Sequence, residues 1–258
     1  MLRVVNLTKV YDNGTVALKN VSFDVQDGEF LAVIGLSGSG KSTLLRCINR
    51  LIDPTEGEIW LDDINVTALK IGELRPLRRR IGMIFQQFNL VKRSSVLTNV
   101  LTGRLGYTPP LWSLGNRFSK ADHQRAMDAL RRVGIEDKAR IRADQLSGGQ
   151  QQRVGIARAL MQDPQLVLAD EPVASLDPVL AHSIMGYLEE LNRNDGRTII
   201  CSLHYLDLVQ RYADRVIGLR AGEIVYHGTR EQIRRLTDAE FAEIYGEEAQ
   251  RLGSITGA

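Results

Sequence analysis

The sequence is poor in cysteine, with only two among its 258 residues. Cys47 and Cys201 stand far apart, and neither has the C-x-x-C neighbour of a redox or zinc site. This argues against a disulfide framework of the kind that staples small secreted domains. It predicts instead two reduced thiols in the core of a cytosolic protein.

Long apolar runs are lacking as well. No run approaches the roughly 20 residues that span a bilayer. The first residues, MLRVVNLTKVYDNG, contain no apolar segment of the signal-peptide type. We therefore expect any role at a membrane to depend on a partner.

An excess of charge of one sign is also absent, because 33 basic residues face 31 acidic ones for a net charge of +2. This balance gives no indication of a nucleic-acid partner. The basic clusters RPLRRR (75–80) and RRL (234–236) are interpreted as solvated helix surface. The chain shows no internal repeat and no low-complexity tract.

The residues that are present predict a sizeable core, since 43% of them are hydrophobic. Alternating or continuous apolar runs, punctuated by turn residues, predict a series of strands. These are LRVVNLTKVY (2–11), LKNVSFDV (18–25), EFLAVIG (29–35), GEIWL (57–61), IGMIF (81–85), QLVLAD (165–170), RTIICS (197–202), RVIGLR (215–220) and EIVYHG (223–228).

Between residues 88 and 164 the pattern is helical, so the strand layer is interrupted and then resumes. One helix is predicted to begin at Ser119, with Asp122 in the capping-box position, and to end at Gly134. Another follows from Gln150. The order of elements predicts an α/β domain with an inserted helical subdomain.

GLSGSGKS (35–42) matches the pattern G-x-x-x-x-G-K-[ST]. It lies between a buried strand and a helix that Pro54 is expected to stop, with the apolar face Leu44, Leu45, Ile48, Leu51 and Ile52. Glycines allow the backbone to turn its N–H groups toward a β-phosphate. Lys41 is predicted to reach the β- and γ-phosphates, and the Ser42 hydroxyl to ligate Mg²⁺. This loop, with the following residue, supplies the predicted nucleotide-binding residues Gly35, Leu36, Ser37, Gly38, Ser39, Gly40, Lys41, Ser42 and Thr43.

LVLADEP (166–172) places two carboxylates directly after a buried apolar strand. Asp170 is predicted to hold Mg²⁺, which takes one or two carboxylates and keeps several waters. Glu171 is the candidate general base that takes a proton from the attacking water.

A second anion site is predicted in LSGGQQQR (146–153), where Ser147, Gly148 and Gly149 precede an amphipathic run that starts at Gln150. The N-terminus of a helix offers free backbone N–H groups and a partial positive charge. The chain thus contains two phosphate-binding features, and one nucleotide needs only one of them.

The chain resembles the ATP-binding subunits of ATP-binding-cassette (ABC) transporters over residues 1–228. The resemblance lies in the order of its motifs: the phosphate loop, FQQ, LSGGQQQR, LADEP, SLD and LH. The resemblance implies a P-loop NTPase fold of ABC type, an α/β fold with a RecA-like core, an antiparallel β subdomain and an inserted α-helical subdomain. It divides a single ABC ATPase domain, 1–258, into a core (1–87 and 165–228), an inserted subdomain (88–164) and a C-terminal helical tail (229–258).

The resemblance also implies why there are two anion sites. Subunits of this family pair head-to-tail, so that Ser147, Gly148, Gly149 and Gln150 of one chain would bind the ATP held by the phosphate loop of the other. ATP would close the homodimer and hydrolysis would release it. Asp177 resembles the acid of the loop that crosses this interface, and it is also suited to cap the helix that follows Pro178.

Three further residues carry over from the family. Tyr11 resembles the aromatic residue that stacks on adenine, with a core aromatic as the alternative. Gln86 resembles the glutamine that senses Mg²⁺ and the attacking water, with Gln87 as an adjacent rival. His204 resembles the histidine that contacts the γ-phosphate and holds Glu171 in place, and a satisfied core histidine is the alternative.

Three segments of the sequence resemble the ATP-binding subunits of bacterial phosphonate importers. They are LADEPVASLDP (168–178), residues 202–228 and the insert GRLGYTPPLWSLGNRFSKAD (103–122). Tyr205 departs from this group, in which glutamine is expected. The alternative cargo is another small polar solute, such as phosphate or a polar amino acid. Within the insert, Leu111 and Trp112 are expected either to dock on the membrane subunits or to cover the subdomain's own core.

The resemblance implies several partners: a second copy of the chain, integral permease subunits, and a periplasmic or extracellular solute-binding protein. The cofactors would be ATP and Mg²⁺. The expected location is the cytoplasmic face of the bacterial inner membrane, as a peripheral protein. A soluble ABC ATPase acting on DNA or ribosomes is the less favoured class, because those proteins usually carry two cassettes or a long coiled coil. A non-hydrolytic regulator is disfavoured by the presence of Glu171 and His204.

Overall fold

The computed structural model describes residues 1–109, 118–174, 176–235, 240 and 244–245. The chain forms two compact units, Met1–Leu69 with Thr198–Ala258, and Lys70–Arg197. The predicted docking residues Leu111 and Trp112 and most of the predicted tail lie outside the described residues.

The first unit contains an antiparallel sheet in the order β2-β1-β4-β5. It is built from β1 (Leu2–Val10), β2 (Val16–Val25), β4 (Glu56–Leu61) and β5 (Ile64–Asn65). Alternating apolar residues of β2, such as Val21, Phe23 and Val25, are buried. The turn between β1 and β2 is closed by backbone bonds between Tyr11 and Gly14 and between Tyr11 and Thr15. The strands that the sequence predicts at 2–11 and 18–25 are confirmed.

The same unit contains four strands in the order β10-β9-β3-β8. β3 (Phe30–Ile34) runs parallel to β8 (Thr198–Ser202) and to β9 (Arg215–Arg220), and β10 (Glu223–Thr229) runs antiparallel to β9. Every residue of β3 and β8 is buried, as their continuous apolar runs predict. Because β3 and β8 are parallel, the segments that follow them leave the sheet at the same edge. Two helices follow the outer strands in this unit, α8 (Leu206–Tyr212) and α9 (Arg230–Arg234).

Helix α1 (Lys41–Ile48) is shorter than the sequence predicts. It ends at Ile48, before Pro54, the residue that is expected to stop it. Arg50 has a left-handed φ of 54°, its N–H bonds to Cys47, and the N–H of Leu51 bonds to Arg46. This Schellman-type ending needs a residue that tolerates positive φ, which is usually glycine. Here the Arg50 guanidinium bonds to Asp53 and to the backbone carbonyls of residues 66, 67 and 69, and these contacts hold it in place.

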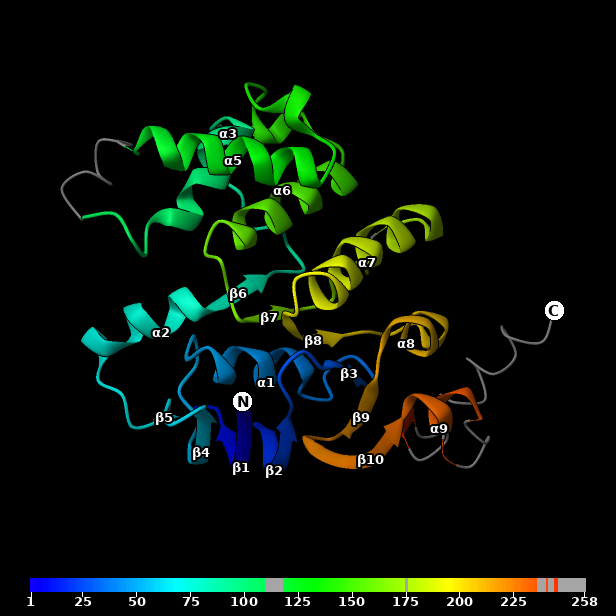
Figure 1. The fold of residues 1–258 in the computed structure, drawn as a ribbon. Coiled ribbons are helices and arrows are strands. Elements are labelled where there is room, and N and C mark those ends of the chain that lie inside the picture. The colour runs from blue at the N-terminus through cyan, green and yellow to red at the C-terminus, as the bar shows by residue number, and fades with distance from the viewer. Residues whose placement is uncertain (110–117, 175, 236–239, 241–243, 246–258) are drawn as a thin grey trace. The chain divides into compact units, whose positions relative to one another are not determined.

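The second unit contains a parallel strand pair, β6 (Ile81–Ile84) and β7 (Leu166–Ala169), and α2 (Leu74–Arg80) leads directly into β6. Three helices pack against one another in this unit: α3 (Val96–Leu101), α5 (Lys120–Arg132) and α6 (Gly148–Leu160) (Figure 1). The long helix α7 (Pro178–Arg193) contacts α6. Short 3-10 turns at 71–73, 102–104, 136–138 and 143–145 connect these elements.

The predicted ends of two helices are confirmed in this unit, whereas the helix predicted from Gln150 begins earlier, at Gly148. Ser119 caps α5 in a reciprocal capping box with Asp122, and Gly134 follows its end with a φ of 67°. Asp177 caps α7 by accepting a hydrogen bond from the N–H of Leu180, with Pro178 in the first turn. These caps fix where each helix begins, and therefore where the residues just ahead of it lie.

Two further expectations can be compared with the structure. Cys47 and Cys201 are buried and form no disulfide bond, and burial raises the pKa of the Cys47 thiol to about 12, so it remains a neutral core group. None of the helices in the described part of the chain combines the length and the apolarity needed to cross a membrane.

We expect Ile184→Ala in α7 to lower the free energy of unfolding by about 2–5 kcal/mol, because the fully buried side chain leaves a cavity. Val179 on the same helix is 79% exposed, so Val179→Ala is the matched control and should change stability by less than about 0.5 kcal/mol. Urea denaturation followed by circular dichroism measures both. Equal losses in the two variants would contradict the assignment of the α7 core face.

Candidate functional site

The loop between β3 and α1 turns so sharply that it needs glycine. Gly35 and Gly40 have φ values of 141° and 108°. A Cβ on Gly35 would lie 2.1 Å from the backbone oxygen of Leu219, and one on Gly40 would lie 2.4 Å from that of Ala17. Neighbouring backbone thus leaves no room for a side chain at either position, and the loop is held close to the end of the sheet.

Lys41 turns back into this loop from the first position of α1. Its side chain is buried, and its Nζ donates to the carbonyl oxygens of Gly35 at 2.8 Å and Leu36 at 2.9 Å. Both of these acceptors are neutral, so they orient the ammonium without neutralising its charge. The sequence-predicted phosphate ligand therefore lies against the loop that carries it.

The rest of the loop fits a polyphosphate. A Cβ on Gly38 would meet nothing within 4 Å, so the space over this residue is open. The Ser39 hydroxyl is buried and, among the described residues, makes no hydrogen bond. No side chain caps the N-terminus of α1 at Gly40, which leaves the first-turn N–H groups as anion donors. Ser37 is exposed, while Leu36, Ser42 and Thr43 are half-buried.

Tyr11 lies beside the start of α1. Its hydroxyl shares a hydrogen bond of 3.2 Å with the Thr43 hydroxyl, and the Lys9 ammonium lies 5.4 Å from its ring centroid. The residue is only half-buried, so it is not a core aromatic. The stacking of this ring on adenine, which the family resemblance implies, remains a prediction.

His204 lies at the same sheet edge as the phosphate loop. Val33 of β3 pairs with Ser202 of β8, and the Leu203 N–H donates to the Val33 carbonyl at 3.0 Å. His204 therefore leaves β8 where Gly35 leaves β3. It is half-buried, and the pairing brings it to the phosphate loop within the first unit.

In the second unit, the ends of β6 and β7 bring a glutamine and a carboxylate together. Asp170 and Glu171 follow β7, and the Asp170 N–H donates to the Ile84 carbonyl of β6. Gln86 Nε2 donates to Glu171 Oε2 at 2.9 Å. This contact favours Gln86 over its neighbour Gln87 as the residue that acts with Glu171.

Glu171 also has an unusual backbone, with a left-handed φ of 47°. This conformation costs a non-glycine residue on the order of 1 kcal/mol, and such strain is concentrated at functional sites. Its neighbour Asp170 is buried, whereas Glu171 is half-buried. The turn after β7 therefore buries one carboxylate and keeps the other accessible.

The second predicted anion site is an exposed helix start. Ser147 caps α6 in a capping box with Gln150, whose Oε1 accepts from the Ser147 N–H at 3.0 Å. Ser147 and Gly148 are exposed. Gly149 is buried, and a Cβ there would lie 2.9 Å from Leu180 Cδ1, so this glycine also allows α6 to approach α7. The Gln150 side chain serves the cap.

Asp177 is exposed, although its side chain also caps α7. Ser175, two residues before Asp177, lies outside the described residues. The sequence analysis did not identify Arg158 of α6, which contacts the segment after Gln86. Nothing in its local pattern distinguishes it from other helical arginines.

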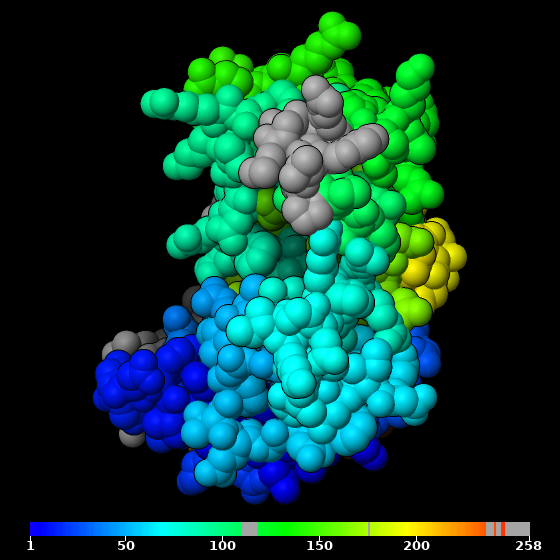
Figure 2. All heavy atoms as spheres, turned by 90° about the vertical axis from the view of Figure 1, so that its left-hand side faces the viewer, coloured from blue at the N-terminus to red at the C-terminus, as the bar shows by residue number. Residues whose placement is uncertain are grey.

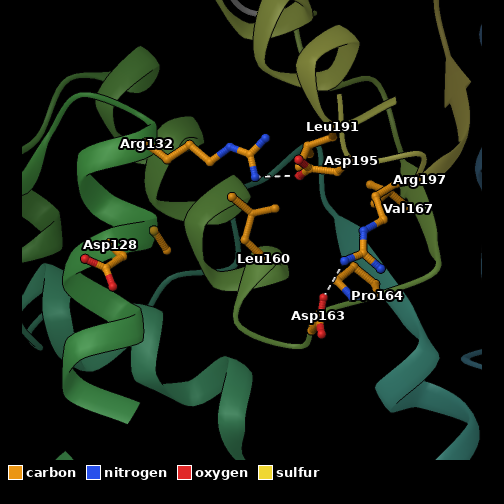
Figure 3. A pocket seen from close by; sticks show the side chains of 10 residues that line it. Asp128, Arg132, Leu160, Asp163, Pro164, Val167, Leu191, Asp195 and Arg197 are labelled. Carbon is orange, nitrogen blue, oxygen red and sulfur yellow. Dashed lines mark hydrogen bonds and ion pairs between the residues drawn. The ribbon is translucent and has the colours of Figure 1, made fainter. Parts of the chain in front are cut away.

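A cavity of about 220 Å³ in the second unit is lined by none of the predicted site residues (Figure 3). Its apolar lining includes Leu160 and Leu191. Its two arginines point toward carboxylates, in the pairs Arg132–Asp195 and Arg197–Asp163, each 2.6 Å long. Since both cations are already paired, we interpret this cavity as part of the packing between helices.

Comparison with known proteins places this arrangement in a family. A family model described as "ABC transporter" matches residues 18–174. The phosphonates import ATP-binding protein PhnC of Lactobacillus johnsonii is 54% identical over 245 residues, which are 95% of this chain and 95% of that protein. The protein of the same name in Bdellovibrio bacteriovorus is 55% identical over 251 residues, or 97% of this chain and 95% of that protein.

Solved structures agree. A dimeric ATP-binding cassette in a post-hydrolysis state, bound to ADP and Pi, matches with a TM-score of 0.80 and 38% identity over 89% of this chain and 99% of that chain. A second dimeric structure, of a bacterial ABC transporter cassette, gives a TM-score of 0.81 and 39% identity with the same coverage.

We expect Lys41→Ala to weaken ATP binding by about 10- to 100-fold, because it removes a charge-assisted contact worth about 1.5–3 kcal/mol. Lys19 is an exposed lysine of the same unit, ion-paired with Glu223 at 2.7 Å, so Lys19→Ala is the matched control. Isothermal titration with ATP measures both variants. Unchanged affinity in Lys41→Ala would contradict the assignment of this loop to phosphate.

Proposed function

This chain belongs to the ABC transporter family, and we propose that it is the ATP-hydrolysing subunit that energises import of a phosphonate, or a related phosphorus oxyanion, through a membrane permease. The observation that carries the hydrolytic part is the contact of Gln86 with the strained, accessible Glu171 carboxylate at the end of β7. The cargo rests on the names of relatives that are 54–55% identical over nearly the whole chain.

We assign the binding of ATP to the phosphate loop. The Lys41 ammonium and the first-turn N–H groups of α1 bind the β- and γ-phosphates, and Tyr11 stacks on the adenine. The buried Ser39 hydroxyl and the open space over Gly38 support this assignment. Ser42, Asp170 and Gln86 have the oxygen donors that Mg²⁺ prefers, and the metal would neutralise charge on the phosphates.

We assign the proton transfer to Glu171. Its carboxylate takes a proton from water as the water oxygen attacks the γ-phosphorus, and ADP leaves. Gln86 orients Glu171 through the hydrogen bond from its Nε2. His204, at the phosphate-loop edge of the sheet, donates to the γ-phosphate, and the sequence resemblance assigns it the further role of holding Glu171.

The exposed start of α6 is assigned to the nucleotide of a second copy of the chain. The capping box uses the N–H groups of Ser147 and Gln150. The N–H groups of Gly148 and Gly149 are the remaining donors of the first turn, and they suit a γ-phosphate. The exposed Asp177 lies in the loop that would cross the same interface. The dimeric state of two similar cassettes supports a head-to-tail homodimer.

The membrane partners follow from the same proposal. Integral permease subunits would hold the chain at the cytoplasmic face of the bacterial inner membrane, and a periplasmic or extracellular solute-binding protein would deliver the cargo. The ATPase does not contact the cargo, so its own residues do not select phosphonate. Two alternatives are another small polar solute as cargo and a soluble ABC ATPase without a transport role. The growth test below separates phosphonate import from both.

A groove in the second unit suits a permease segment. It encloses about 360 Å³ between α2 and residues 102–107, and Figure 2 shows the surface hollowed beside the cyan atoms of α2. Ile71 at its rim is 87% exposed. Arg75 donates to the carbonyls of Leu105, Gly106 and Thr108, so the cluster at 75–80 is more than solvated surface.

The groove is also positively charged. Arg79 donates to the Gly106 carbonyl at 2.6 Å, and neither it nor Arg75 pairs with a carboxylate among the described residues. Both guanidinium charges therefore stay uncompensated by acids of this unit. We propose that an amphipathic cytoplasmic segment of the permease, carrying at least one acidic residue, occupies this groove.

We expect Glu171→Gln to abolish growth on a phosphonate as sole phosphorus source when it replaces the parent gene in a deletion strain, with normal growth on orthophosphate. Loss of a general base lowers turnover about 10²- to 10⁴-fold, while ATP binding and dimer formation persist. Glu56→Gln, at an exposed glutamate, is the matched control. Normal growth of the deletion strain on phosphonate would reject the cargo, and ATP turnover by purified Glu171→Gln would reject the base.

We expect Ile71→Glu to reduce co-purification with the permease subunits from membranes at least tenfold, because a carboxylate replaces an exposed apolar contact. ATP binding by the isolated subunit should not change. Val16→Glu alters a 49% exposed valine far from α2 in sequence and serves as the control. Equal recovery of the two variants would place the permease contact elsewhere.

A further inference from the structure

The segment that follows β6, residues 85–89, has a strained backbone. Phe88 and Asn89 are consecutive non-glycine residues with left-handed φ values of 47° and 49°. For phenylalanine this conformation costs on the order of 1 kcal/mol and persists only when its surroundings impose it, whereas asparagine adopts it more readily. The segment has no strand or helix hydrogen bonding of its own. Contacts from outside the segment must therefore hold it in this shape.

Arg158, in the last turn of α6, provides such contacts. Its guanidinium donates to the Asn89 carbonyl at 2.6 Å and to the Phe88 carbonyl at 2.8 Å, and it lies 6.0 Å from the centroid of the Phe85 ring. The single guanidinium group of Arg158 thus bonds to the backbone of both Phe88 and Asn89. The planar fork of arginine suits two neighbouring acceptors, which the single ammonium of lysine cannot match.

This arrangement places a cation among neutral acceptors. Within the described part of the chain, Arg158 has no carboxylate partner, and burial lowers the pKa of its guanidinium. Desolvating a cation without an opposite charge is unfavourable. An arginine on an exposed helix face would avoid this desolvation cost. We therefore interpret the burial of Arg158 as serving its hydrogen bonds to residues 88 and 89.

The segment also lies near the opposite end of the same helix, and it contacts the candidate base through Gln86. A Cβ on Gly148, in the first turn of α6, would lie 3.9 Å from Phe88 Cζ. Two residues before Phe88, Gln86 donates to Glu171 at 2.9 Å. Hydrogen bonds therefore tie the segment to the last turn of α6 and to the carboxylate at the end of β7, and Phe88 lies near the exposed start of α6.

We propose that Arg158 is a positioning residue for ATP hydrolysis, which clamps residues 88–89 to α6 and thereby holds Gln86 against Glu171; this rests on the function proposed above. The clamp makes the position of Gln86 depend on α6. The helix whose start meets the partner's nucleotide thus also sets the geometry of the base in its own chain.

The test compares Arg158→Lys with Arg153→Lys in the full-length chain. Arg153 is on the same helix and also bonds to a backbone carbonyl, that of Val133, but it does not contact residues 85–89. We expect Arg158→Lys to lower kcat about tenfold or more, since small misplacements near a reacting group have such effects. Its KM for ATP should change less than twofold, and Arg153→Lys should retain the parent kcat.

Coupling to Gln86 distinguishes positioning from general stability. In a Gln86→Ala background, Arg158→Lys should change kcat less than twofold, because the residue through which Arg158 acts is gone. The same fold-loss in both backgrounds would overturn the proposal. If Arg158→Lys fails to fold by circular dichroism, Arg158→Gln, which keeps a shorter neutral donor, replaces it in the cycle.

Hydrogen–deuterium exchange supplies a readout that does not depend on activity. Arg158→Lys should speed exchange in the peptide covering residues 86–90 at least fivefold, while Arg153→Lys leaves it unchanged. Unchanged exchange in Arg158→Lys would overturn the clamp. A parent chain that does not hydrolyse ATP would instead overturn the proposed function, and the exchange result would still decide whether the clamp exists.

Discussion

The organisation of the first unit depends on the close approach of neighbouring backbone to the loop after β3. The carbonyl oxygens of Leu219 and Ala17 leave no space for a Cβ at Gly35 and Gly40, so the loop can only follow the path that glycine allows. That path brings the Lys41 ammonium to the carbonyls of Gly35 and Leu36. The parallel pairing of β3 with β8 then brings His204 to the same edge. A steric constraint on the loop and the pairing of two strands thus determine where Lys41 and His204 lie.

In the second unit, hydrogen bonds to strained residues take the place of glycine. Glu171, Phe88 and Asn89 all have positive φ, which glutamate and phenylalanine rarely adopt and asparagine adopts more readily. Gln86 bonds to the first of these through its side chain, and Arg158 bonds to the other two through their carbonyls. The strain is therefore stabilised by polar contacts that a movement of α6 would alter. Steric exclusion by backbone fixes the path of the phosphate loop. The position of the Glu171 carboxylate depends instead on hydrogen bonds.

The sequence predicts the features that depend on local chemistry. The apolar runs of β3 and β8, the caps at Ser119 and Asp177, and the glycine loop before Lys41 follow from residue type and spacing. The contacts of Arg50, Arg75 and Arg158 could not be predicted in this way, because their acceptors are backbone carbonyls, which every residue carries. The early end of α1 was missed for the same reason, since the left-handed Arg50 depends on distant carbonyls. The roles of the site residues and the subdomain boundaries remain predictions.

The start of α6 illustrates how one segment serves both the fold and the proposed site. Ser147 and Gln150 satisfy each other's backbone N–H groups, which fixes the helix start without any outside partner. Because the capping box uses these two donors, the N–H groups of Gly148 and Gly149 remain for an anion. Gly149 must lack a Cβ so that α6 can approach Leu180 of α7, and the last turn of the same helix contains Arg158. A ligand on the first turn therefore acts on an element that is already fixed at its start, packed against α7, and bonded to the segment that carries Gln86.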